Sequence, residues 1–291
     1  MFLYLAIPLY QALNLSTKLF TVRLNIIDVD SYDSNKDIQR IDIRSIPAVT
    51  GIFNSSTSSK CSNVNLRKAI CYAIDNAAVA SAETVKAEAT YGIGANNVGA
   101  PADWTTGRDY YNYDASKVKD YLTKAGYNGE TLTLMYVSTN QYDVDAAIVI
   151  QSELKAAGIT VDLQGLDRQV INTKKFDPDG GWDLRLESLS GRSDSINTLM
   201  KYFISTENAS HFKNGETITM VADDKLDKLS QAVVADNSEA NIDAWDDYFT
   251  FEQCYGYAIC TYTSSTAARS NVVVVQGTKD RIYPNACSLS E

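Results

Sequence analysis

Residues 64–75 read Val-Asn-Leu-Arg-Lys-Ala-Ile-Cys-Tyr-Ala-Ile-Asp, and this stretch decides the fold. Asn63 or Asn65 is placed to accept hydrogen bonds from the free N–H groups of a first helical turn. The apolar side chains recur at the spacing of one buried helical stripe, which comprises Leu66, Ile70, Ala73, Ile74 and Ala77. The pattern predicts an amphipathic helix that starts at about residue 64 and packs against a core.

Downstream, helical and strand patterns alternate. A helix over 114–125 is expected to begin at the capping residue Asp114 and to end at Gly126. The elements that follow are a strand over 131–137, a helix over 143–157, a strand over 159–164, a short helix over 167–175 and a strand over 182–189. Helical crossovers give parallel strands, so we predict an α/β fold, a β-α-β-α-β sheet with helices on both faces.

The flanking regions carry simpler patterns. Strands are expected over 22–30 and 39–49, with a polar loop over 54–63. A Gly- and Asn-rich stretch over 92–107 carries few regular signals. Two helices, about 223–235 and 239–253, are followed by strands over 256–262 and 271–276.

Composition narrows the class of protein. The 291 residues are 45% hydrophobic and 21% charged, with a formal net charge of −10. Nucleic-acid binding demands a basic face, so a nucleic-acid partner is disfavoured. The apolar residues Met1 to Leu13 lack the cationic start and cleavage site of a signal peptide, and they are too short to span a bilayer. We expect them to form a buried strand or helix.

The reactive residues favour no enzyme. The single histidine, His211, lies in a polar stretch without a nucleophile motif, and no phosphate-binding glycine loop is present. The Asp177–Gly181 segment lacks the full calcium-loop series and is expected to be a turn. We therefore expect no catalytic residues, no metal and no cofactor.

The five cysteines show no close pair of the kind that binds zinc. Cys254 and Cys260 are expected along one extended stretch, too far apart for a bridge. Cys61 and Cys71 would pair only if the intervening loop folds back onto the helix. Most of the thiols, Cys287 included, are expected to be unpaired.

Four segments resemble, in the same order, the dipeptide- and oligopeptide-binding proteins of bacterial ABC importers, which are the bacterial extracellular solute-binding proteins of family 5. Residues 64–75 are similar to the V-R-x-A-x-x-Y-A-I-D segment that opens the second lobe of that family. Residues 113–127 resemble its Y-D-P-x-K-A-K-x-L-L-x-x-A-G-Y, and 151–161 its I-Q-x-x-L-K-x-x-G-I-x-V. Trp182-Asp183-Leu184 stands where the family has a strand that begins with Asp.

The resemblance implies a lobe with the type II periplasmic-binding-protein fold. It assigns residues 1–60 to a residual first-lobe or hinge segment, 61–254 to the second ligand-binding lobe, and 255–291 to strands that return toward the first lobe. The chain would be a truncated, C-terminal portion of an extracytoplasmic solute-binding protein, periplasmic or a cell-surface lipoprotein, which delivers a peptide or similar solute to ABC permease subunits. Its membrane association would require a lipid anchor that this chain lacks.

In open α/β sheets, ligands bind beyond the carboxyl ends of the strands. The loop after 131–137 supplies Ser138, Asn140 and Tyr142, and the loop after 159–164 supplies Leu166, Asp167 and Arg168. The loop after 182–189 supplies Ser190, Arg192 and Asp194 beside helix N–H groups. Trp104, in an irregular loop, is the aromatic candidate for a cleft.

The loop over 190–194 departs from the family pattern. In the family, an aspartate of the run A-D-Y-P-D-P receives the ammonium group of the peptide. Alignment from Leu199 places that aspartate at Gly191 or Arg192, and Asp194 falls two or three positions later. An arginine there suits a ligand carboxylate better than an ammonium group. Asp194 is equally expected to be a helix N-cap, whereas an arginine such as Arg192 is more often a solvated loop cation than a ligand clamp.

Two other classes of function stay open. Residues 1–60 fit the family badly and contain the apolar Phe2 to Leu13, which favours a stand-alone interaction module that docks to another protein and binds no small solute. A hydrolase would need a nucleophile, and the sequence singles out none.

Overall fold

The computed structural model describes residues 21–22, 34–83, 86–106, 111–189, 195–274 and 288–289. The strands are β1 (Thr21–Val22), β2 (Ile38–Phe53), β3 (Ala87–Ala89), β4 (Leu132–Val137), β5 (Val161–Leu166), β6 (Leu184–Glu187), β7 (Gly256–Arg269), β8 (Val272–Val273) and β9 (Ser288–Leu289). The α-helices are α2 (Val64–Ala73), α3 (Asn76–Ala82), α4 (Asp103–Thr106), α5 (Ala115–Ala125), α6 (Gln141–Ala156), α7 (Arg168–Lys174), α8 (Ile196–Met200), α9 (Asp224–Ala235) and α10 (Glu239–Asp246). The tighter or wider turns are η3 (Lys60–Ser62), η5 (Lys201–Phe203), η6 (Thr206–Asn208) and η7 (Asp247–Glu252).

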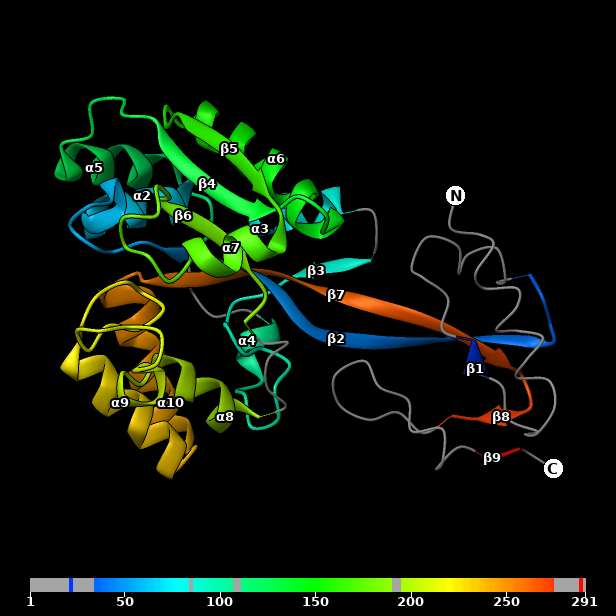
Figure 1. Ribbon diagram of the computed structural model, residues 1–291. Helices are drawn as coiled ribbons and strands as arrows, with labels where there is room; N and C mark the ends of the chain where they lie inside the picture. The colour runs from blue at the N-terminus through cyan, green and yellow to red at the C-terminus, as the bar shows by residue number, and fades with distance from the viewer. Residues whose placement is uncertain are drawn as a thin grey trace. The chain divides into compact units, whose positions relative to one another are not determined.

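The chain divides into two compact units, Met1–Ile43 with Thr263–Glu291, and Arg44–Tyr262. In the described part of the first unit, β1 pairs with the end of β7 through Thr21 and Ala268, and β8 pairs with β9. The second unit carries all the described helices (Figure 1). The domain bounds expected at 60/61 and 254/255 differ from these units, and they stay a prediction.

A parallel sheet forms the centre of the second unit. Strand β4 pairs in parallel with β5, Leu132 opposite Val161, and with β6, Leu134 opposite Leu184. Strand β2 runs antiparallel to β6, and β3 runs antiparallel to β7. The order β7-β2-β6-β4-β5 contains the three parallel strands that the sequence predicted, so the expected β-α-β-α-β sheet is confirmed.

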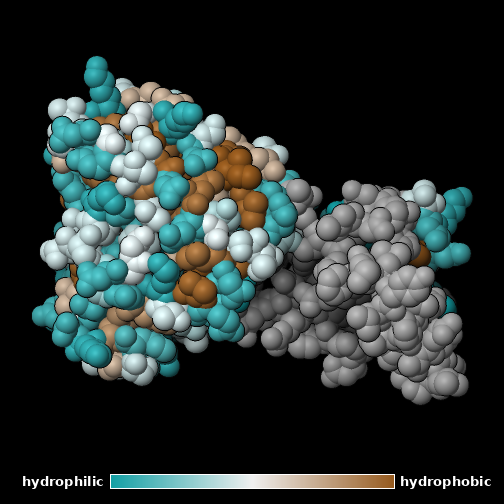
Figure 2. All heavy atoms as spheres, turned by 45° about the horizontal axis from the view of Figure 1, so that its top comes forward, coloured by the Kyte–Doolittle hydropathy of each residue, from teal (hydrophilic) through white to brown (hydrophobic). Residues whose placement is uncertain are grey.

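Helices cover both faces of this sheet (Figure 1). Alternate residues of β4 point to opposite faces, so Leu134 joins a core with α2, α3, α5 and α6, while Met135 joins a core with α7 to α10. Strand order explains this division. Since β5 and β6 flank β4 on opposite sides, right-handed crossovers require α6 and α7 to lie on opposite faces. The visible surface mixes hydrophilic residues with small apolar areas (Figure 2).

Local signals set several helix ends as predicted. Asp114 accepts hydrogen bonds from Ser116 N and Lys117 N at the start of α5, and Gly126 ends that helix with a positive φ of 65°. The predicted stripe of residues 64–77 is interrupted, however. Ile74 is extended, Asp75 caps α3 as a separate helix, and Ala77 is exposed. The expected helix 239–253 likewise divides into α10 and the π-helical turn η7.

Four cysteines lie in the described part of the chain, and all four are buried and free. Cys61 and Cys71 are not bridged, whereas the sulfur of Cys71 lies beside that of Cys254. Cys287, the segment Met1 to Leu13 and most of the strand expected over 22–30 lie outside the described residues.

Candidate functional site

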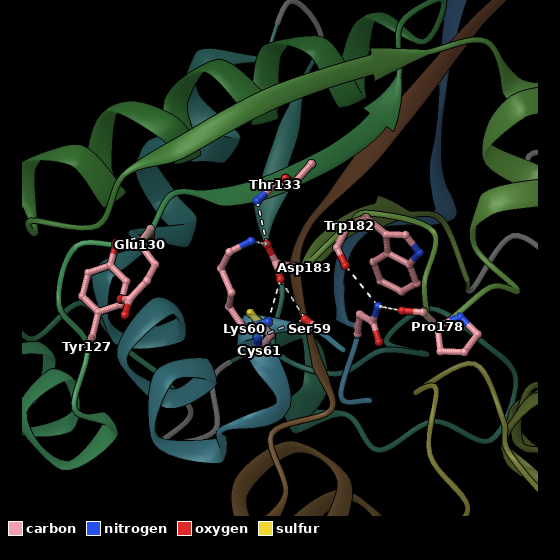
Figure 3. Close-up of polar contacts among 10 residues, drawn as sticks. Ser59, Lys60, Cys61, Tyr127, Glu130, Thr133, Pro178, Trp182 and Asp183 are labelled. Atoms are coloured by element: carbon pink, nitrogen blue, oxygen red, sulfur yellow. Dashed lines mark hydrogen bonds and ion pairs between the residues drawn. The ribbon is translucent and has the colours of Figure 1, made fainter. Parts of the chain in front are cut away.

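The amino ends of the parallel strands are joined by one buried carboxylate, that of Asp183 (Figure 3). Its Oδ1 accepts hydrogen bonds from Ser59 Oγ at 2.8 Å and from Lys60 N at 2.9 Å. Its Oδ2 accepts from Thr133 N, at the start of β4, at 2.9 Å and from Lys60 Nζ at 3.2 Å. The side chain therefore links the segment before α2 to β4 and β6, and it fixes the edge opposite the candidate site.

The expected polar loop over 54–63 belongs to this anchor. Asn54, Ser55, Ser56 and Ser59 are buried instead of exposed. Asn54 donates from Nδ2 to Pro178 O at 2.9 Å and to Trp182 O at 3.1 Å. Buried polar side chains require internal partners, which two backbone carbonyls supply for Asn54 and the Asp183 carboxylate supplies for Ser59.

The carboxyl ends of the strands carry the candidate ligand site. Ser138 N donates to Leu166 O at 2.9 Å, which holds the loops after β4 and β5 side by side. Ser138 is exposed, whereas Asn140 and Tyr142 are half-buried at the start of α6. The Tyr142 ring stacks on Tyr262 with 4.0 Å between the ring centroids. The three predicted residues of this loop thus lie together at the predicted edge.

Asp143 is the buried charge of this edge. Its Oδ2 accepts a hydrogen bond of 3.4 Å from Val137 N, at the end of β4. Burial raises the pKa of the carboxyl to about 6, although the hydrogen bonds from Asn140 and Val137 and the positive charge of Arg168 act in the opposite direction. Asp143 therefore links the β4 loop electrostatically to the start of α7.

A second polar group lies at the end of β6. Glu187 accepts from Lys175 Nζ at 2.9 Å and from Arg185 Nε at 3.0 Å, and both cations are buried. A cavity of about 50 Å³ opens beside them and is also lined by Phe176, Leu189, Tyr202, Asn208, His211 and Ile218. The volume suffices for one or two water molecules, so this cavity is too small for a peptide.

A third carboxyl, that of Glu83, follows α3. The residue is 9% exposed, and neither carboxyl oxygen has a hydrogen-bond partner among the residues that the structure describes. Burial, together with the negative charges of Asp145 and Asp143, raises its pKa to about 8. The carboxyl is therefore mostly protonated at neutral pH.

The structure places the other predicted residues differently. Trp104 is fully buried, and its ring lies so close to Gly92 that a Cβ there would meet the ring at 2.0 Å. This burial favours a packing role over contact with a ligand. Ser190, Arg192 and Asp194 lie outside the described residues. Asp167 caps α7 by accepting from Gln169 N at 2.8 Å, and Arg168 beside it is exposed.

Sequence reasoning missed Asp143, Glu187 and Glu83. Asp143 had a signal, because it stands four residues before Ala147 on the predicted inner stripe of the helix, where a charged residue is unusual. Glu187 alternates with the apolar Leu184 and Leu186 in a central strand. Glu83 had no local signal, since α6 and β7 bury it from far along the chain.

Neither a metal centre nor a membrane span emerges from the described residues. No group of three or more His, Cys, Asp or Glu side chains among them has the arrangement to hold a metal ion. No helix in the same ranges is long and apolar enough to cross a membrane.

Comparison with known proteins identifies relatives. The model of the bacterial extracellular solute-binding proteins, family 5 Middle, matches residues 9–211. No curated protein matches the sequence.

Solved structures share the fold. CtaP, an ABC transporter substrate-binding protein of Listeria monocytogenes, is 15% identical with a TM-score of 0.70, over 88% of this chain and 51% of CtaP. AppA, the oligopeptide-binding protein of Bacillus subtilis solved with a nonapeptide, is 17% identical with a TM-score of 0.67, over 94% of this chain and 56% of AppA. NikA of Brucella suis, solved with Fe(III)-EDTA, is 15% identical with a TM-score of 0.72, over 94% and 57%. The chain thus spans about half the length of these proteins, and the likeness shows a type II periplasmic-binding-protein fold.

Proposed function

Because the chain belongs to family 5 of the bacterial extracellular solute-binding proteins, we propose that it binds a peptide or similar small solute for an ABC importer. The binding edge would be the carboxyl ends of β4, β5 and β6. The observation that carries this proposal is the convergence of Ser138, Asn140 and Tyr142 with the buried Asp143 at that edge. Proteins of this family bind and release solutes and are not enzymes.

The groups at this edge suit a peptide ligand. Ser138 and Asn140 supply both donors and acceptors for a peptide backbone, and Tyr142 offers an amphipathic ring. Asp143 and Arg168 add one charge of each sign, which matches the two ends of a zwitterionic peptide. Arg192 and Asp194 of the neighbouring loop are proposed to complete the site. Binding would require no covalent chemistry.

Affinity is expected to be weak in this chain alone. A complete two-lobe binder of micromolar affinity has a binding free energy of about −8 kcal/mol. One lobe that supplies half the contacts would retain about −4 kcal/mol, which corresponds to a millimolar Kd.

A thermal-shift titration tests the proposal. Pooled di- to pentapeptides at about 10 mM should stabilise a millimolar site by about 1.4 kcal/mol, a rise of a few degrees in Tm. The rise should vanish in Asn140→Ala, Arg192→Ala or Asp194→Ala. Asn128→Ala, in the exposed loop before β4 at the opposite edge, is the matched control and should keep the rise.

Two outcomes would contradict the proposal. A rise that survives all three substitutions would place the ligand elsewhere. The absence of any rise, combined with a stable and specific dimer, would favour the stand-alone interaction module instead.

A further inference from the structure

Two thiols of the core lie in contact. Cys71 on α2 and Cys254 after η7 are both fully buried, and their sulfur atoms are 3.4 Å apart across 183 residues of sequence. Cys61 and Cys260 lie in the same apolar core, but neither contacts another sulfur in the described part of the chain. The contact is therefore a property of one pair and not of the core as a whole.

The buried guanidinium of Arg67 fixes this pair. It donates to Cys254 O at 2.9 Å, to Gln253 O at 2.6 Å and to Cys61 O at 2.7 Å. Cys254 itself has a φ of 50°, a conformation that residues other than glycine rarely adopt. These hydrogen bonds hold the backbone of Cys254 in that conformation and direct its side chain to Cys71, one helical turn after Arg67.

The two sulfurs differ electrostatically. Burial raises the pKa of the Cys71 thiol, and its hydrogen bond to Cys254 raises it further. Burial also acts to raise the pKa of Cys254, but the hydrogen bond from Cys71 and the positive charge of Arg67 hold it below its usual range. The contact between the two sulfurs and the charge of Arg67 thus shift the two pKa values in opposite directions.

We propose that Cys71 and Cys254 are the site of an intramolecular disulfide, formed by exchange with a disulfide-bearing oxidant such as oxidised glutathione. One of the two cysteines, as its thiolate, attacks one sulfur of the oxidant, so the S–S bond of the oxidant breaks and one thiolate leaves. The other cysteine then loses its proton and attacks the protein sulfur of the mixed disulfide, which releases the second oxidant thiolate. Two cysteine thiols are oxidised and one oxidant disulfide is reduced to two thiols.

The site favours oxidation during folding. Both sulfurs are inaccessible in the folded chain, so the exchange occurs before the segment after η7 docks on α2. The sulfurs must then approach from 3.4 Å to about 2.05 Å, the length of a disulfide bond. Once formed, the bond would resist reductants that cannot enter the core. The inference does not depend on solute binding, and its test involves no ligand.

The experiment refolds the chain with oxidised and reduced glutathione, then blocks the remaining thiols in denaturant and digests the product. Chymotrypsin, which cleaves after Tyr255 and Tyr257, separates Cys254 from Cys260. The number of blocked thiols should fall from five to three, and mass spectrometry should find one cross-linked peptide pair containing Cys71 and Cys254. The oxidised chain should melt several degrees higher than the reduced chain.

Matched variants distinguish this pair from the other buried thiols. Cys71→Ser and Cys254→Ser should abolish the cross-link and the rise in Tm. Cys61→Ser and Cys260→Ser, which also alter buried cysteines, should retain both. Five blocked thiols after oxidative refolding, or cross-links that join Cys61, Cys260 or Cys287 as often as this pair, would overturn the inference.

Discussion

Two buried carboxyls in the same unit have opposite surroundings. Asp183 is 3% exposed and accepts four hydrogen bonds, from Ser59, Thr133 and both nitrogens of Lys60. Glu83 is 9% exposed and accepts none among the described residues, while Asp143 and Asp145 add negative charge nearby. The Asp183 carboxylate links two strands through hydrogen bonds, whereas the Glu83 carboxyl is mostly protonated and therefore uncharged at neutral pH.

The difference follows from what each location offers. A carboxylate is tolerated in a protein interior when hydrogen-bond donors replace its water shell. Asp183 accepts from two backbone N–H groups at element starts, those of Lys60 and Thr133. Glu83 follows α3, which packs against α6, and no donor of the described residues reaches its oxygens. The same chemical group therefore stabilises the fold as a carboxylate at Asp183, whereas ionisation at Glu83 would destabilise it.

The largest effect is expected for Asp183→Ala. This change removes four hydrogen bonds, and it takes the Asp183 acceptor from the partly buried Lys60 N and Thr133 N, so it should cost about 3–5 kcal/mol of unfolding free energy. Urea denaturation measures the cost. Asp162→Ala, on the exposed face of β5, is the matched control and should cost less than about 1 kcal/mol. A small loss of unfolding free energy in Asp183→Ala would show that the Asp183 carboxylate does not hold the strands together.

Glu83→Gln should stabilise the chain at high pH, whereas Asp183→Ala destabilises it. The folded chain holds a proton with a pKa of about 8, against 4.5 for an ordinary glutamate, so wild-type stability falls as pH rises from about 4.5 to about 8. The glutamine side chain does not ionise, so the variant avoids this loss of stability. It should be more stable than wild type by about 1–3 kcal/mol at pH 9. Melting curves from pH 5 to pH 9 measure the difference.

The buried Asp143 and the half-buried Glu153 add slopes of the same sign. Burial raises the pKa of Asp143 to about 6 and that of Glu153 to about 7. The difference between the curves of wild type and Glu83→Gln isolates the contribution of Glu83. Glu207→Gln, at an exposed position in η6, should leave the wild-type curve unchanged. Parallel curves for wild type and Glu83→Gln would show that Glu83 does not titrate in this range.

Lys60→Met separates the ion pair of Asp183 from its backbone hydrogen bonds. The Lys60 side chain is 47% exposed, so its ion pair with Asp183 is screened by water and should contribute less than about 1 kcal/mol. The backbone N–H of residue 60 still donates in the variant. Unfolding free energies of Lys60→Met and Asp183→Ala, measured together, separate the two contributions. Equal losses would show that the ion pair, and not the backbone hydrogen bonds, stabilises the anchor.

Features that depend on neighbouring residues could be predicted from the sequence, whereas features that depend on distant contacts could not. Helix caps such as Asp114 and Gly126 depend on neighbouring residues, and the sequence predicted both. The parallel strands were predictable from the alternation of helical and strand patterns. The burial of Asn54, Ser56 and Ser59 was not predictable, because it depends on distant groups: the Pro178 carbonyl accepts a hydrogen bond from Asn54, and Asp183 accepts one from Ser59. The candidate edge was predicted from topology, whereas the buried charges beside it depend on contacts across the chain.

The smallest expected effect tests the cause of the Glu83 shift. Burial is the larger cause, and the negative charge of Asp145 is the next. Asp145→Asn removes this charge but keeps an oxygen that can accept the 2.7 Å hydrogen bond from Gln141 Nε2. The Glu83 carboxyl should then titrate at lower pH, which NMR of labelled glutamate side chains measures directly. Asp162→Asn, an exposed charge change on β5, should leave the midpoint unchanged. If Asp145→Asn also leaves it unchanged, burial and the charge of Asp143 account for the raised pKa of Glu83 without Asp145.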